Sequence, residues 1–119
     1  MATHGLSVAE RLADAVIALR GRPLPPALRA RAEELLIDVT GLCVAARRND
    51  YMRALVASVD AGGGCTALVH AETYRAEDAA MINGTAAHGE DFDDTFEGGP
   101  VHSSAVVVPA VLEIGRAHV

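Results

Sequence analysis

Residues Asn83 to Pro109 read NGTAAHGEDFDDTFEGGPVHSSAVVVP. The stretch opens with small residues, passes through a polar loop, and closes with an apolar run that contains a proline. Alanine favours helices and lets neighbouring backbones approach closely. We therefore expect an interior helix from about residue 76 toward Gly89. A serine at 103 or 104 is a favoured helix cap, so the apolar run is either a helix that kinks at Pro109 or an extended segment followed by a helix from Pro109.

Three more helices are predicted upstream, which makes the fold class all-α. Ser7 and Glu10 have the spacing of a capping box, and apolar residues follow at helical steps until about Gly21. Prolines 25 and 26 suit the start of a second helix, 26–47. Its predicted apolar stripe is Leu28, Leu35, Leu36, Val39, Leu42 and Cys43. A third helix is expected over 51–59, followed by glycines and a short extended segment over 65–70.

Composition and charge exclude several classes of protein. Ten basic residues against sixteen acidic ones give a formal charge of −6, which disfavours nucleic acids and anionic membranes as partners. The longest apolar run, 105–112, is far shorter than the roughly 20 residues that span a bilayer. The first residues lack the basic charge of a secretory signal, and the two cysteines fit a reduced compartment. We therefore expect a cytoplasmic protein with no membrane segment.

The polar loop concentrates the candidate chemistry. Its five acids are Glu90, Asp91, Asp93, Asp94 and Glu97. A solvated acidic loop is one interpretation, and a Mg²⁺ or Ca²⁺ site is a second, although the spacing is not that of an EF-hand. Zinc is disfavoured because His88 and His102 are fourteen residues apart, without a second ligand at short spacing. Acid–base chemistry is the third interpretation, since Asp91, Thr95 and His102 supply an acceptor, a hydroxyl and a group that titrates near neutrality.

The loop resembles the MmgE/PrpD family, which includes 2-methylcitrate dehydratase and cis-aconitate decarboxylase. The residues that carry the resemblance are the string NGTAAH, the block DFDDT at 91–95, the histidine seven residues later and the apolar run with a proline. Leu24, Pro25 and Pro26 before a helix are similar to the opening segment of that family. The resemblance covers about residues 7–112. It implies that this chain is part of a large, mostly helical domain, with a smaller lid domain encoded further on.

Family membership implies an active site in this loop. Asp91, Thr95 and His102 match the motif residues. Asp91 would orient the proton-transferring group and tune its acidity. Thr95 would bind a substrate carboxylate, and His102 would bind substrate or transfer a proton. The serines of the loop, Ser103 and Ser104, are expected to bind substrate at a helix N-terminus. Asp93 and Asp94 would brace the loop, with Phe92 packed beneath it. No metal and no cofactor are expected.

The implied reaction is dehydration of a hydroxy-polycarboxylate in propionate metabolism, by a carbon–oxygen lyase that is a homodimer when full length. Decarboxylation of a cis-aconitate-like substrate or epimerisation stays open, as does a small acidic, helical metal-binding module. The family often has proline where this chain has Ser103. The resemblance implies a catalytic lysine beyond residue 112, and this chain contains no lysine, so the chain alone is expected to be inactive.

The last seven residues, 113–119, read EIGRAHV. This is what the opening of a widely used sequencing adapter encodes when it is translated. We therefore expect residues 1–112 to be the native, truncated portion of the domain and 113–119 to be a non-native tail.

Overall fold

The computed structural model describes residues 5–116, with side chains described as far as Glu113. The elements, in chain order, are α1 (Val8–Leu19), α2 (Pro26–Ala46), α3 (Asp50–Ala57), β1 (Cys65–Thr66), β2 (Thr73–Tyr74), α4 (Ala76–His88) and α5 (Ser104–Arg116). The fold is mostly helical, as predicted. Strand β2, which pairs antiparallel with β1, was not predicted; it is only two residues long and its sequence lacks a strand pattern.

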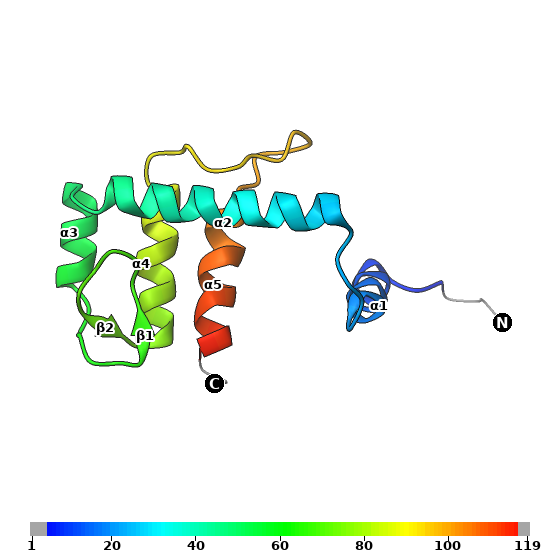
Figure 1. Cartoon of the computed structure of the whole chain (residues 1–119), viewed down its shortest axis with the longest axis horizontal. Helices are drawn as coiled ribbons and strands as arrows, with labels where there is room; N and C mark the ends of the chain where they lie inside the picture. Colours follow the sequence, from blue (N-terminus) through cyan, green and yellow to red (C-terminus); the bar gives the residue numbers. More distant parts are fainter. Residues whose placement is uncertain (1–4, 117–119) are drawn as a thin grey trace.

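The long helix α2 organises the molecule. In Figure 1 it lies across the ends of α3, α4 and α5, and the small hairpin lies beside α4. Helix α5 packs against α4, and both pack against α2. The loop 89–103 leaves the end of α4, passes over α2 and returns to the start of α5 (Figure 1). The end of α4 and the start of α5 therefore meet on the same side of the molecule.

The core lies between the C-terminal half of α2 and helices α3, α4 and α5. Its members are mostly small: Val39, Cys43, Ala46, Met52, Cys65, Ala67, Tyr74, Ala79, Ile82, Ala86, Ala87 and Ala105 are buried. Small side chains bring helix backbones close together. At Gly84 a Cβ atom would lie 3.1 Å from the carbonyl oxygen of Ala105 on α5, so glycine permits the close approach of α4 and α5.

Helix α5 runs through Pro109 without interruption. The alternative in which residues 105–108 are extended is therefore wrong. Proline has no N–H to donate to the carbonyl four residues earlier, which is the Ala105 carbonyl that lies against Gly84. Pro109 is itself fully buried, so tertiary packing against α4 compensates for the lost hydrogen bond.

The N-terminal part of the chain exposes its apolar side chains. The capping box of α1 forms as predicted, with the Glu10 N–H donating to Ser7 Oγ at 3.2 Å, but α1 buries no residue. On α2, Val39 and Cys43 are buried, whereas Leu28 is 57% and Leu36 43% exposed. The predicted stripe of α2 is thus covered only in its second half. Between residues 5 and 116 no helix has both the length and the hydropathy of a membrane span.

Candidate active site

The loop after α4 turns sharply back on the helix that precedes it. Asp91 has a positive φ of 58°, and its N–H donates to the His88 carbonyl at 2.9 Å. Aspartate tolerates this left-handed conformation better than most residues. A side chain at Gly89 would collide with the Tyr51 ring, since its Cβ would lie 2.4 Å from the Tyr51 hydroxyl. The turn therefore directs the following acids toward the last turn of α4.

Two imidazoles and two carboxylates meet behind this turn. Nδ1 of His88 lies 3.0 Å from Oδ1 of Asp93, and Nδ1 of His102 lies 3.4 Å from the same oxygen. The two rings are 4.8 Å apart at their centroids. Nε2 of His102 also lies 3.6 Å from Oδ1 of Asp91. We call His88, Asp91, Asp93 and His102 the histidine–aspartate cluster.

Asp93 is the centre of the cluster. Its side chain is fully buried, whereas that of Asp91 is 78% exposed and that of His88 is 53% exposed. A buried carboxylate requires charged or hydrogen-bonding partners. Nδ1 of His88 is hydrogen-bonded to it, and Nδ1 of His102 lies close to it without a hydrogen bond of good geometry. The Asp93 carboxylate thus orients the His88 ring and lies against the His102 ring, and proton transfer through an imidazole requires an oriented ring.

Two of the remaining acids have partners elsewhere, which relieves the repulsion expected in the loop. Oδ1 of Asp94 accepts the Ser104 N–H at 2.9 Å, and Oδ2 accepts the Ser103 hydroxyl at 2.9 Å. The pKa of Asp94 is lowered, first by the Ser104 side chain and also by the Ser104 N–H and the Ser103 hydroxyl. Glu90 accepts hydrogen bonds from Asn49 and Tyr51. The loop is therefore pinned to α5 and α3, so a simply solvated acidic loop does not describe it.

The residues predicted from the sequence divide into three groups. Asp91 and His102 come together in the cluster. Thr95 is exposed and makes no hydrogen bond described within residues 5–116, so its substrate contact stays a prediction. Ser103 and Ser104 bind Asp94, so the helix N-terminus predicted to bind an external anion holds a carboxylate of the chain itself.

Three residues differ from the expectation. Phe92 is 76% exposed, so the prediction that it packs beneath the loop is wrong; the turn at Asp91 rotates it outward. His88 and Asp93 were not predicted as cluster members. The one sequence signal for His88 was its place in the last turn of an apolar helix, directly before the acidic loop.

A cavity of about 640 Å³ opens beside the cluster. His88, His102 and Thr85 line it, and its other walls are mostly apolar residues such as Met81 and Val106. A polar reactive edge on a mostly apolar hollow is typical of small-molecule sites. The cavity therefore presents both imidazoles to whatever enters it.

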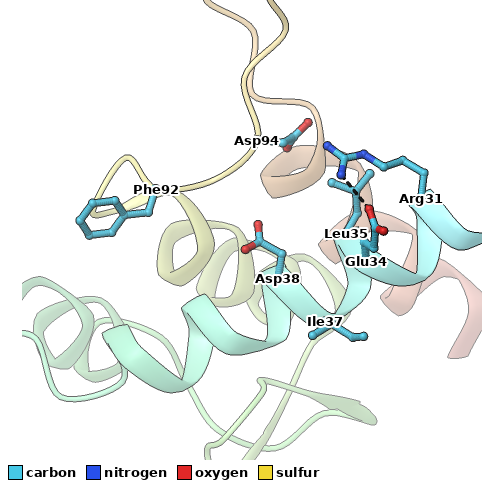
Figure 2. Close-up of a pocket in the computed structure, with 7 residues that line it drawn as sticks. All are labelled: Arg31, Glu34, Leu35, Ile37, Asp38, Phe92 and Asp94. Atoms are coloured by element: carbon cyan, nitrogen blue, oxygen red, sulfur yellow. Dashed lines mark hydrogen bonds and ion pairs between the residues drawn. The ribbon is translucent and has the colours of Figure 1, made fainter.

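A second cavity, of about 450 Å³, lies between α2 and the loop. Figure 2 shows that Arg31 is paired with Glu34, while the carboxylates of Asp38 and Asp94 lie near them. Phe92 points away from these residues (Figure 2). Three acids against one arginine make this cavity unfavourable for a polycarboxylate. The cavity beside the histidines is therefore the better candidate for a small-molecule site.

The comparisons with known proteins identify the family of the chain. The chain matches the MmgE/PrpD N-terminal domain over residues 10–117, and it therefore belongs to the MmgE/PrpD family. The match extends through the first residues of the predicted non-native tail, whose last three residues lie outside the described part of the chain; the tail stays a prediction. A curated relative, the cis-aconitate decarboxylase-like protein oryM of Aspergillus oryzae, is 24% identical over 109 residues. The alignment covers 89% of this chain and 23% of that protein. No solved structure matches the chain.

Proposed function

We propose that the histidine–aspartate cluster is part of the active site of a lyase that acts on a di- or tricarboxylate. The observation that carries the proposal is the buried Asp93 carboxylate between two imidazoles, at the edge of a 640 Å³ cavity. Two imidazoles beside a buried carboxylate have the residue types that serve as general base and general acid. Family membership supports lyase chemistry of this kind.

The reaction we favour is dehydration of a hydroxy-polycarboxylate of the 2-methylcitrate type. A base removes the proton on the carbon next to a carboxylate, and its electron pair forms the new C=C bond. The C–O bond of the neighbouring carbon breaks, and an acid protonates the departing hydroxide, which leaves as water. His102, which lies between Asp91 and Asp93, is assigned to one proton transfer, and His88 lies close enough to serve the other. Thr95 is assigned to a substrate carboxylate, whereas Ser103 and Ser104 hold Asp94 at the start of α5.

Decarboxylation is the second candidate, and the printed name of the Aspergillus oryzae relative favours it. In that reaction a C–C bond breaks, CO₂ leaves with the former carboxylate carbon, and an acid protonates the carbanion. Both reactions need a proton donor at the same place, so the cluster serves either one. Dehydration releases water and creates a double bond, whereas decarboxylation releases CO₂, and the two products are easily separated.

The chain spans about a quarter of the length of the relative it matches, so the activity belongs to the larger enzyme of which we propose it forms part. Cations that offset the charge of a polycarboxylate beside Asp91 and Asp93 would come from the remainder of that enzyme. A homodimeric assembly and a cytoplasmic location are further parts of the proposal.

The test uses the full-length enzyme and its variants His102→Gln, Asp93→Asn and, as a matched control, His70→Gln, which replaces a histidine outside the cluster. We expect the two cluster variants to lose about 10²–10⁴-fold in kcat with unchanged circular dichroism, as removal of a general acid or base does. The control keeps its activity. Near-normal turnover in both cluster variants would remove the cluster from the catalytic machinery.

A further inference from the structure

The histidine–aspartate cluster has the composition and geometry of a transition-metal site, and we propose that it binds one Zn²⁺ ion. Each of its four residues offers one ligand atom, and these four atoms lie within 4.8 Å of one another. The inference goes beyond the proposed lyase activity, because metal binding needs neither a substrate nor the remainder of the enzyme.

Two pairs of these ligand atoms are already close to the required spacing. In a tetrahedral site with bonds of about 2.0–2.1 Å, neighbouring ligand atoms are about 3.3–3.4 Å apart. The Asp93 oxygen lies 3.0 Å from Nδ1 of His88 and 3.4 Å from Nδ1 of His102. Movements of a few tenths of an ångström at these two pairs therefore suffice.

Burial supports the same assignment. The Asp93 side chain is fully buried, and Nδ1 of His102 is a buried ring nitrogen with no hydrogen bond of good geometry. A buried polar atom without a proper partner is uncommon and calls for an explanation. A metal ion bound by this nitrogen and by the Asp93 oxygen would satisfy both atoms together.

The donor set selects the metal. Two imidazole nitrogens and one or two carboxylate oxygens form a mixed nitrogen–oxygen set, which zinc accepts in tetrahedral sites. Mg²⁺ prefers six oxygen ligands and keeps much of its water, so it is a poor match for two imidazoles. The Asp91 side chain is 78% exposed, and it is the natural fourth ligand or leaves that position to water.

The histidines are fourteen residues apart in sequence, which argued against zinc when only spacing was known. The structure removes that objection, because α4 ends where α5 begins and the turn at Asp91 brings the loop back between them (Figure 1). A zinc ion here would occupy the nitrogen lone pairs that proton transfer requires. We therefore expect added Zn²⁺ to inhibit the full-length lyase.

The experiment titrates Zn²⁺, and separately Mg²⁺, into the purified 119-residue chain and into three variants by calorimetry. The variants are His88→Gln, Asp93→Asn and the control His70→Gln. Co²⁺ serves as a spectroscopic probe, because tetrahedral Co²⁺ absorbs visibly. Circular dichroism verifies the helical content of each protein. His4 and His118 are present in every protein, so binding there contributes equally to all.

We expect one Zn²⁺ per chain for the wild type and the control, tetrahedral Co²⁺ absorption, and no Mg²⁺ binding. Loss of a ligand weakens Zn²⁺ binding by at least about tenfold, since even changes outside the ligand shell cost that much. His88 is half exposed, so its replacement stays decisive if the Asp93 variant fails to fold. Equal Zn²⁺ affinity in wild type and His88→Gln would overturn the proposal. Because no substrate is present, this outcome is independent of the lyase test.

Discussion

Replacing Asn83 with alanine is the sharpest test of how the fold positions the site. Asn83 lies in α4, five residues before His88, and is 1% exposed. Its Oδ1 accepts the Leu68 N–H at 2.7 Å, and its Nδ2 donates to the Thr66 carbonyl at 3.2 Å. This side chain therefore ties the hairpin segment to the helix that carries a cluster histidine.

The expected cost follows from these two bonds. A buried N–H that loses its acceptor costs about 1–3 kcal/mol, and an ordinary hydrogen bond contributes about 0.5–1.5 kcal/mol net. Asn83→Ala should therefore lower the free energy of unfolding by roughly 2–4 kcal/mol. For a chain of this size that corresponds to a fall in Tm of roughly 8–16 °C.

The measurement is urea and thermal unfolding followed by circular dichroism. Asn49→Ala is the matched control, because Asn49 bonds Glu90 at the surface and should cost no more than about 1 kcal/mol. Asn83→Asp is a second probe: it keeps an acceptor for Leu68 but places a carboxylate oxygen against the Thr66 carbonyl. If Asn83→Asp or Asn83→Ala unfolds at the wild-type midpoint, the assigned role of Asn83 is wrong.

Three further predictions concern the stability of the fold around the candidate site. Val69 has a φ of 62°, a backbone conformation that glycine adopts more easily than valine. Val69→Gly should therefore raise the free energy of unfolding by roughly 1 kcal/mol. The control Val101→Gly, at a residue with an ordinary φ, should not raise it, and the denaturant midpoints of the two variants test this. Gly63→Ala should lower the free energy of unfolding by about 2 kcal/mol or more, because its Cβ would collide with the Tyr74 carbonyl oxygen. In the control Gly64→Ala, the new Cβ meets no atom within 4 Å. Equal unfolding free energies for the two variants would contradict this geometry. Burial raises the pKa of Cys43 to about 11, so the folded state keeps a proton that the unfolded state releases near its ordinary value of 9.0. Stability should therefore fall as pH rises from 9 toward 11, less so in Cys43→Ala, and iodoacetamide should label Cys43 only in denaturant.

Local signals predicted most of the helices. The capping box at Ser7, the prolines before α2 and the glycines after α3 act through neighbouring residues, so their effects are visible in the sequence. The hairpin was only half predicted, because β2 is specified by its pairing with β1 and by the close approach of Gly63 to Tyr74. The sequence also did not predict which half of α2 is buried, because that depends on where α4 and α5 pack.

The candidate site shows the same division. The residue types of the DFDDT block and of the histidine seven residues after it predicted acid–base chemistry at Asp91 and His102. His88 and Asp93 entered the site only through the turn at Asp91 and the contact of α4 with α5. Phe92 was misplaced because the same turn rotates it outward, and a positive φ at an aspartate has no reliable sequence signal.

The amino-acid sequence by itself determined that this chain is helical, that its reactive side chains gather in one acidic loop, and that it resembles a family of carboxylate lyases. Those properties depend on composition, local propensity and motif, which act over a few residues. Only the tertiary structure decided that Asp93 lies buried between His88 and His102. That contact joins the end of one helix to the start of another, and its geometry depends on how closely Gly84 lets the two helices pack.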